Sequence, residues 1–324
     1  MKKRFFKYDF GTLLLAGGML LLATACSKDE TEDGQRTDIS DKDIRMNVDV
    51  WRVMEGTRAT TFDNPTALQN EGSFTCYAYN GETTTTFING STVNWIGSEN
   101  TWAFADGKKY WPATGSLDFF AYMPAEKPAY ISAVSYTTAQ NPTITCTSLP
   151  MTAATQGADL KEFVWAITTG QNKTDQGESG VTINFLHPFA RIYLRWSDVN
   201  HSAITLNSVK LKNIYNNGTC TLSYDGTTSK WISTWSPNGD KTDFSTTTLA
   251  ANDLSDAVPY LVIPQTFAGT IEVNATWDDW GVSLPHTITA SVPTNWEPGY
   301  SYTYTFTITP TDLIVNTAKY TEQW

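Results

Sequence analysis

Hydrophobic and polar residues alternate at every second position through most of the chain after residue 43. Near the start, Ile44, Met46, Val48 and Val50 alternate with polar or charged residues. Near the end, aromatic and β-branched residues alternate with Ser and Thr from residue 300 to residue 308. A period of two is typical of a half-buried β-strand. The pattern therefore predicts a first strand at residues 44–54 and a late strand at residues 300–308.

Many shorter runs of the same kind lie between these two strands. Turn-forming dipeptides separate several of them, including Asn80-Gly81, Asn89-Gly90 and Asp225-Gly226. No long run shows the 3.6-residue period of a helix. Many short strands joined by Gly, Asn and Pro turns predict an all-β fold made of β-sandwiches rather than a parallel sheet.

A polar segment at residues 168–180 interrupts the alternation and predicts a division into two sandwiches. The expected N-terminal sandwich covers residues 44–179 and the expected C-terminal sandwich covers residues 180–310. A long hairpin loop has the same composition, so that alternative stays open. Residues 311–324 follow Pro310 and form a separate C-terminal segment.

The N-terminal 25 residues have the pattern of an export signal. A basic head of Lys and Arg precedes a short apolar run that ends in Ala23-Thr24-Ala25, directly before Cys26. The run is too short for a membrane-spanning helix, which needs about 20 apolar residues. Small residues before a cysteine fit lipoprotein processing, which would make Cys26 the lipidated first residue of the mature chain and anchor it to a membrane. A buried cysteine after an ordinary secretory signal is the alternative.

Residues 26–43 are polar and charged, which is typical of a flexible acidic tether. The acidic run at residues 27–33 resembles the export tag that directs lipoproteins of some gut and oral anaerobes to the outer face of the outer membrane. The expected location is therefore the cell surface, although a solvated linker has the same composition.

The charge and the cysteines exclude some partners and leave one question open. The formal net charge of −11 argues against a nucleic-acid partner, because phosphate backbones are bound by Lys and Arg. Three cysteines besides Cys26 show no metal-binding spacing, so each is expected to be buried as a small apolar residue. One disulfide among them stays open; they are Cys76, Cys146 and Cys220.

No pattern of catalytic residues stands out, and the sequence predicts neither an enzyme nor a cofactor nor a metal site. His187, His201 and His286 are far apart in sequence, and His187 lies in a strand pattern. Asp278 and Asp279 are adjacent carboxylates, but cleavage of a glycan would need a second carboxylate at a defined separation from the first. A turn between two edge aromatics is the simpler interpretation of this stretch.

Four stretches occur in an order that resembles the fimbrillin family, the type V pilins of gut and oral anaerobes. They are YWPATGSLDFFAYMP (residues 110–124), FLHPFARIYLRW (185–196), YLVIPQTF (260–267) and WEPGYSYTYTFTI (296–308). With the lipoprotein signal, the resemblance covers essentially the whole chain. It implies two transthyretin-like β-sandwiches in tandem and a structural fimbrial subunit.

The resemblance also implies a maturation step. In this family an arginine-specific protease cuts the surface precursor after the first strand, and the vacated groove accepts a strand from a neighbouring subunit. Here the candidate cut lies between Arg58 and Ala59, and the removable strand presents Met46, Val48 and Val50. A solvated turn residue is the alternative interpretation of Arg58.

The C-terminal segment is the candidate donor strand, with Leu313, Val315 and Thr317 facing one way. An edge strand within its own chain is the alternative. The expected partners are other pilin subunits and, through the lipid anchor, the outer membrane; a host receptor or a glycan is a further candidate.

A glycan-binding surface lipoprotein is the competing function, because twelve Trp and fifteen Tyr could supply stacking platforms. The direction in which the aromatic side chains point separates the two interpretations. Six tryptophans near turns are ambiguous in sequence: Trp95, Trp102, Trp111, Trp277, Trp280 and Trp296.

Overall fold

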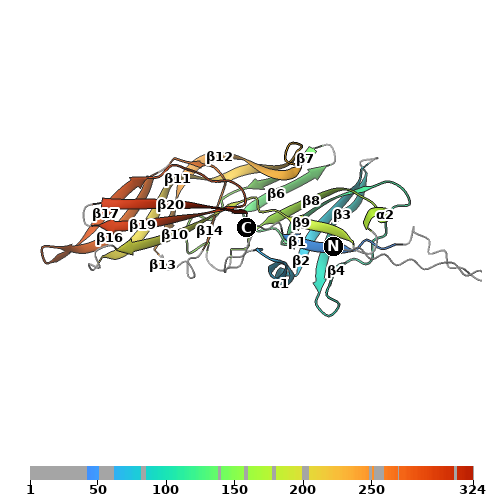
Figure 1. The fold of residues 1–324 in the computed structure, drawn as a ribbon, viewed down its shortest axis with the longest axis horizontal. Coiled ribbons are helices and arrows are strands. Elements are labelled where there is room, and N and C mark those ends of the chain that lie inside the picture. Colours follow the sequence, from blue (N-terminus) through green and yellow to red (C-terminus); the bar gives the residue numbers. More distant parts are fainter. Residues whose placement is uncertain are drawn as a thin grey trace, which may run out of the picture. The chain divides into compact units, whose positions relative to one another are not determined.

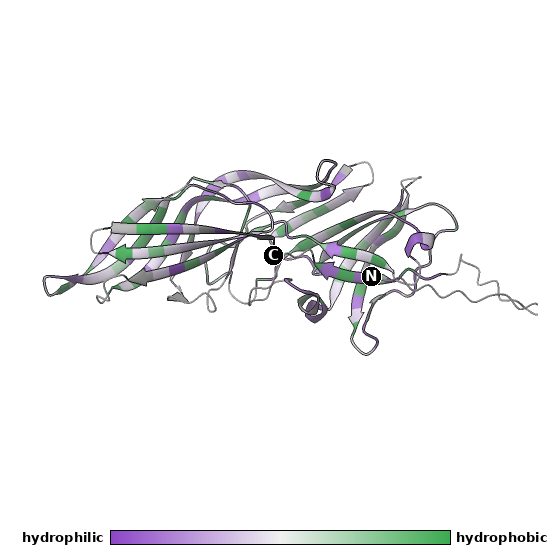
Figure 2. Ribbon diagram, viewed as in Figure 1, coloured by the Kyte–Doolittle hydropathy of each residue, from purple (hydrophilic) through white to green (hydrophobic). Residues whose placement is uncertain are grey.

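The structure is a computed structural model, and it confirms an all-β fold (Figure 1). It describes residues 42–50, 62–81, 85–137, 140–156, 160–176, 180–198, 204–247, 250–251, 259–268, 270–309 and 312–323. All of these belong to one compact unit, Ile39–Trp324. The alternation predicted from sequence is visible along the strands, where hydrophobic and hydrophilic residues follow one another (Figure 2).

The first sheet has seven strands, and its two edge strands, β8 and β9, come together. The order is β8-β5-β2-β3-β4-β1-β9. Trp165 at the β8 end and Leu186 after β9 exchange two backbone hydrogen bonds of 3.2 and 2.7 Å, so the sheet curls around its inner face. Its strands are β1 (Met46–Val50), β2 (Ser73–Asn80), β3 (Thr86–Ile96), β4 (Thr101–Phe104), β5 (Leu117–Met123), β8 (Val164–Gln171) and β9 (Val181–Phe185).

A second sheet of six strands and a third of five form the rest of the fold, with a short two-stranded pair. The six-stranded sheet contains β6 (Ile131–Thr137), β7 (Gln140–Cys146), β11 (Thr205–Asp225), β12 (Lys230–Thr246), β16 (Thr270–Asp279) and β17 (Val282–Ser291). The five-stranded sheet contains β10 (Ala190–Asp198), β13 (Ala250–Ala251), β14 (Tyr260–Val262), β19 (Tyr300–Thr309) and β20 (Asp312–Gln323). The short pair is β15 (Thr266–Phe267) and β18 (Thr294–Asn295).

Three clusters of buried side chains follow from these sheets. The first fills the inside of the seven-stranded sheet and includes Phe74 and Phe119. The second lies between the five-stranded sheet and β11 and β16, with Tyr302 and Tyr304 fully buried. The third packs the outer side of β5 and β8 against β6, β7 and β11, with Trp165 fully buried in it. The sandwich arrangement predicted from the alternation is therefore present.

The strands do not follow the expected division at residues 179 and 180. β9, at the start of the expected C-terminal sandwich, pairs in parallel with β1 in the first sheet. β7, from the expected N-terminal sandwich, pairs with β11 in the six-stranded sheet. Alternation identifies a strand but not the sheet that it joins, so the pairing of residues 181–185 with β1 has no signal in the sequence pattern. A division into two tandem domains stays a prediction.

Two short helices interrupt the strands in the described residues. α1 (Pro65–Glu71) begins at Asn64, whose side chain accepts a hydrogen bond from the N–H of Ala67, and ends at Gly72 in the left-handed conformation. α2 (Lys173–Gln176) is one turn long. Neither helix has the length and apolar character needed to cross a membrane.

Candidate functional site

The strand predicted to be removable, β1, is held mainly by one neighbour. All five of its residues pair in parallel with β9, from Met46 opposite Val181 to Val50 opposite Phe185. On its other side, the pairing with β4 is limited to Met46 opposite Trp102. Most of the backbone contact of β1 within the sheet is therefore made to β9.

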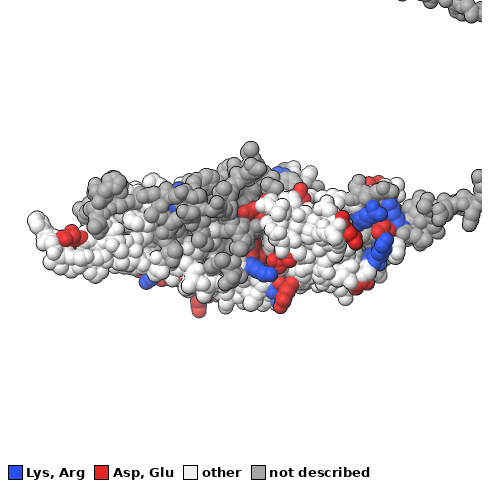
Figure 3. Space-filling model, turned by 90° about the horizontal axis from the view of Figure 1, so that it is seen from below, with Lys and Arg blue, Asp and Glu red and all other residues white. Residues whose placement is uncertain are grey.

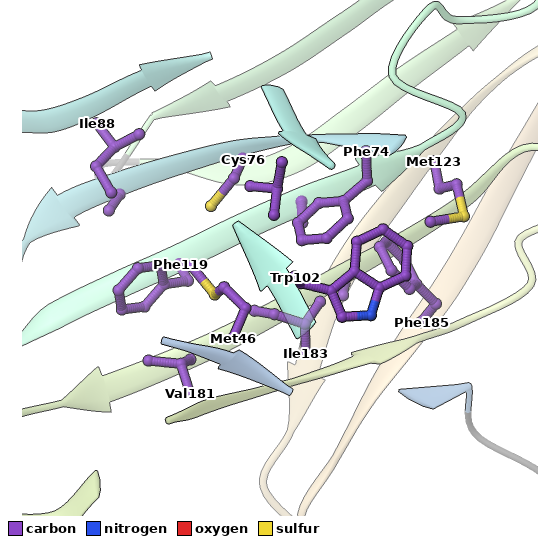
Figure 4. Close-up of a cluster of buried hydrophobic side chains, with 14 of the residues drawn as sticks. Met46, Phe74, Cys76, Ile88, Trp102, Phe119, Met123, Val181, Ile183 and Phe185 are labelled. Carbon is purple, nitrogen blue, oxygen red and sulfur yellow. The ribbon is translucent and has the colours of Figure 1, made fainter. Parts of the chain in front are cut away.

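The side chains of β1 alternate as the sequence predicts. Met46 and Val50 are buried, Val48 is half-buried and packs against the first core, and Asn47 and Asp49 are exposed. Met46 lies among the side chains of the inner face (Figure 4). Its surroundings there are Phe74, Trp102, Phe119, Val181, Ile183 and Phe185. Without β1, this apolar face would be open to water.

A glycine allows β1 to approach β9 closely. Gly180 has φ +80°, and a Cβ on it would lie 2.8 Å from the backbone oxygen of Arg45. The next N–H, that of Val181, donates to the same oxygen at 2.7 Å. A larger residue at position 180 would have to separate the two strands.

The predicted cleavage position lies in the connection that follows β1. Arg58 and Ala59 fall outside the described residues, as does the predicted lipidation site Cys26. The description resumes at Phe62, which is buried in the first core. The candidate cut therefore lies between a short strand and a firmly packed residue.

A buried group of charged side chains fixes the chain just after this connection. Nδ1 of His187 lies 2.8 Å from Oε1 of Glu162, and both side chains are 1% exposed. Arg191 contacts Oε2 of Glu162 at 3.2 Å and Oδ1 of Asp63 at 2.6 Å. Burial alone would lower the pKa of the Arg191 guanidinium, but the carboxylates of Glu162 and Asp63 raise it above its ordinary value. The sequence pattern predicted a strand at His187, whereas this residue is buried in the connection between β9 and β10. The pattern carried no signal for its partners.

The candidate donor segment is an edge strand in this structure. β20 pairs antiparallel with β19, with Val315 opposite Phe306 and Thr317 opposite Tyr304, and has no further partner in its sheet. Val315 packs against the second core, whereas Ile314 and Thr317 are exposed. Leu313 lies in β20 opposite Ile308. The segment thus pairs within its own chain, and its donor role stays a prediction.

Most of the ambiguous tryptophans are part of the cores. Trp102, Trp111, Trp277 and Trp296 are buried, and Trp95 packs half-buried against Trp102 with ring centroids 5.4 Å apart. The exception among the six is Trp280, which is 102% exposed at the turn between β16 and β17. The aromatic residues predicted as possible platforms therefore do not form one surface.

The adjacent carboxylates Asp278 and Asp279 lie at this same turn between β16 and β17. Oδ1 of Asp278 accepts a hydrogen bond from the N–H of Gly281 at 2.5 Å, and Oδ2 of Asp279 lies 3.1 Å from Nε2 of His286. The His286 ring stacks on Trp277 with centroids 3.6 Å apart. These contacts fit the predicted turn, but of its two aromatics Trp280 is exposed whereas Trp277 is buried in the second core. Within the described ranges, no three His, Cys, Asp or Glu side chains are grouped as metal ligands would be.

The three cysteines are free and buried. Burial raises the pKa of the Cys146 thiol to about 12 and also raises the pKa of Cys76 and Cys220. The disulfide that the sequence left open is therefore absent among these three residues, and all three are protonated thiols at neutral pH.

Charged side chains are sparse and mixed on the surface seen in Figure 3, where Lys and Arg lie beside Asp and Glu. Close to β1, the ammonium of Lys108 lies 3.5 Å from Oδ2 of Asp43, and that of Lys109 lies 2.7 Å from Oδ2 of Asp106. The basic residues there are thus balanced by carboxylates.

A family model described as fimbrillin-like matches residues 57–324, which is most of the chain. The chain belongs to the fimbrillin-like family. The match begins just before the predicted cleavage position, so it covers the part of this fimbrillin-like protein that would remain after the cut. A comparison with curated proteins finds no match.

Solved structures share the fold of this fimbrillin-like protein at low identity. A fimbrial protein from Bacteroides vulgatus is 17% identical with a TM-score of 0.58, and the match covers 86% of this chain and 98% of that one. A protein from Bacteroides uniformis, described as a candidate cell adhesion protein, is also 17% identical with a TM-score of 0.52 and the same coverage. One from Bacteroides ovatus with the same description is 16% identical with a TM-score of 0.51, covering 85% and 95% of the two chains. These likenesses show the fold, and the family match supports a fimbrial subunit role.

Proposed function

We propose that this protein is a structural fimbrial subunit that is exported as a surface lipoprotein, cut after its first strand, and polymerised by strand exchange for adhesion. The observation that carries the proposal is the position of β1. It is a short strand with buried Met46 and Val50, it lies inside a curled sheet, and it precedes the predicted cut at Arg58. Membership of the fimbrillin-like family supports the same role.

The vacated groove would bind a new strand strongly. Burial of one Met or Val side chain contributes about 1.5–3 kcal/mol, and β1 supplies two such buried residues. Removal of β1 would also leave the facing N–H and C=O groups of β9 without their partners. A strand from another subunit would restore both the backbone hydrogen bonds and the apolar contacts.

The described side chains of the candidate donor are mostly exposed in its own sheet. Among the β20 side chains that the structure describes, Val315 is half-buried and the others are exposed. By contrast, Tyr302, Tyr304 and Phe306 of β19 are fully buried. Release of β20 would break its hydrogen bonds with β19, and the groove would replace them.

Cys26 and the acidic tether would deliver the precursor. The proposed lipid holds the chain at the outer membrane until cleavage separates the anchored segment from the folded unit. The proposed partners are further fimbrial subunits, and the proposed final location is the fimbrium.

Limited trypsin treatment of the lipid-free chain, starting at Ser27, tests this function. Cuts after Lys28 or Arg36 in the tether would leave β1 in place. From Lys42 onward, we expect the first cut after Arg58, because the carbonyls of Lys42 and Arg45 accept hydrogen bonds from Trp111 and Val181. Intact mass should show loss of the segment up to Arg58, and gels under mild denaturation should show an SDS-resistant ladder. An Arg58→Ala variant is the matched control and should remain a monomer. A wild-type chain that is cut at Arg58 but stays monomeric would contradict strand exchange, and a stable uncut chain would contradict the maturation step.

A further inference from the structure

The segment that cleavage would remove fills more than the β1 position. Before β1, residues 42–44 run alongside residues 109–111, with Asp43 bridged to Tyr110. The N–H of Ile44 donates to the oxygen of Lys109 at 2.7 Å, and the N–H of Trp111 donates to the oxygen of Lys42 at 3.2 Å. Ile44 and Trp111 are both buried in the first core. The groove left by cleavage therefore extends from residue 42 to residue 50.

The residues in this groove define a pattern of charge and burial. Asp43 lies at the outer end, where its carboxylate is 3.5 Å from the ammonium of Lys108, which is 70% exposed. Ile44, Met46 and Val50 then point into the core at every second position, with Val48 half-buried between the last two. An occupant that keeps these contacts presents a carboxylate followed by apolar residues at alternate positions.

The start of β20 carries the same pattern. Residues 43–48 read Asp-Ile-Arg-Met-Asn-Val, and residues 312–317 read Asp-Leu-Ile-Val-Asn-Thr. Asp and Asn are identical at the first and fifth positions, Leu replaces Ile, Val replaces Met, and Thr has nearly the shape of Val. The likeness ends at Lys319, which corresponds to Val50; its aliphatic stem can cover apolar surface while the ammonium reaches water.

We propose that β20 of a second copy of this chain enters the groove in the direction and register of the segment that it replaces. This inference rests on strand exchange as the proposed function. Asp312 then faces Lys108, Leu313 takes the place of Ile44, and Val315 lies opposite Val181. Asn316 lies opposite Thr182, as Asn47 does within the precursor.

In other registers the incoming strand would make fewer of these contacts with the groove. A slip of one residue turns Leu313 and Val315 toward water, because side chains alternate between the two faces of a strand. A slip of two residues keeps the apolar face inward, but it moves the Asp312 carboxylate about 7 Å from Lys108. In one direction that slip also places polar Thr311 in the buried position of Ile44. The charge at Lys108 thus distinguishes registers that the apolar residues alone would allow.

Cysteine cross-linking between subunits tests the register. Thr182→Cys is combined, in the full lipid-free chain, with a cysteine at Ile314, Asn316 or Ala318, which are the outward positions of the incoming strand. Neighbouring strands are about 4.8 Å apart, within the range of a disulfide, whereas positions two residues away are displaced by a further 7 Å or so along the strand. After trypsin treatment and mild oxidation, we expect the Asn316→Cys variant to form a covalent ladder about tenfold faster than the other two.

The matched control is the same double variant without trypsin, in which Asn47 still occupies the position opposite Thr182. It should form no ladder. Faster cross-linking through residue 314 or 318 would overturn the proposed register and leave strand exchange standing. Absence of a ladder with all three cysteines would overturn strand exchange itself.

Charge reversal gives an independent test of the contact between Asp312 and Lys108. Lys108→Glu and Asp312→Lys should each slow polymerisation of the trypsin-treated chain, and the two together should restore the wild-type rate. The control is Lys109→Glu, whose ammonium already pairs with Asp106; it should not be rescued by Asp312→Lys. Additive slowing in the Lys108→Glu, Asp312→Lys double variant would overturn the proposed contact.

Discussion

The backbone oxygen of Arg45 lies against the face of Gly180 from which a side chain would project. A Cβ at residue 180 would be 2.8 Å from that oxygen, and the glycine has φ +80°, which L side chains rarely adopt. The close approach brings β1 onto β9 at the point where their parallel pairing starts. The attachment of the first strand therefore depends on a residue 135 positions away in the chain.

Gly180→Ala should loosen β1 in the precursor. The positive φ alone costs about 1–2 kcal/mol, and the clash with Arg45 adds to it. Gly170→Ala is the matched control, since Gly170 also has a positive φ, of +68°, but has nothing within 4 Å of its added Cβ. Urea unfolding should show a larger loss of unfolding free energy for Gly180→Ala than for Gly170→Ala. Equal losses would show that the approach to Arg45 is not tight.

Met46→Ala should destabilise the precursor by about 2–5 kcal/mol, because it leaves a cavity between β1 and the core. Asn47→Ala changes the next residue, which is exposed, and should lower the free energy of unfolding much less. Chemical denaturation of the two variants and the wild type measures both values. If Met46→Ala costs no more than Asn47→Ala, β1 does not contribute to the core.

The strands could be predicted from sequence because alternation reports burial directly. Met46, Val48 and Val50 were expected to share a face, and the structure places them on the core side. The late strand was also predicted, and Tyr302, Tyr304 and Phe306 are fully buried, although the alternating Ser301 and Thr303 are buried as well. Each of these predictions depends on neighbours within one strand.

What could not be predicted depends on residues that are distant in sequence. The pairing of β9 with β1 and the contacts of Glu162 with His187 and Arg191 have no local pattern. Helix α1 did have a local signal, Asn64-Pro65 at its start and Gly72 after its end, but it is only seven residues long. A helical period is hard to detect over two turns, so the helix was missed.

Glu162→Gln should lower the free energy of unfolding by about 3–5 kcal/mol. It removes one partner from a buried ion pair and leaves the charge of Arg191 less compensated. Lys161→Ala is the control from the adjacent residue. Its ammonium pairs with Glu71 at the surface at 2.8 Å and is 61% exposed, so its loss should cost less than about 1 kcal/mol. Thermal or urea unfolding of both variants provides the comparison. Similar costs would mean that the buried group contributes no more than a surface pair.

The three cysteines should not react with a thiol reagent in the folded chain at pH 8. Burial raises the pKa of Cys146 to about 12, so the thiol stays protonated four pH units below that value, and Cys76 and Cys220 are shifted in the same direction. In denaturant, the lipid-free chain from Ser27 should release three thiols per molecule. Counting of reactive thiols with and without denaturant checks both statements, and one thiol instead of three in denaturant would indicate a disulfide.

Trp280→Asn separates the fimbrial role from glycan binding. Trp280 is fully exposed with φ +57°, a conformation that Asn tolerates, so the change should alter the free energy of unfolding by less than about 0.5 kcal/mol. Trp277→Ala, three residues earlier in the core, should cost about 3–5 kcal/mol. For a strand-exchanging subunit, polymerisation by the Trp280→Asn variant should be unchanged, and neither it nor the wild type should be retarded in an affinity gel that contains polysaccharide. Retardation of the wild type that is lost in the Trp280→Asn variant would instead identify this turn as a glycan contact, because the other tryptophans near turns lie in or against the cores.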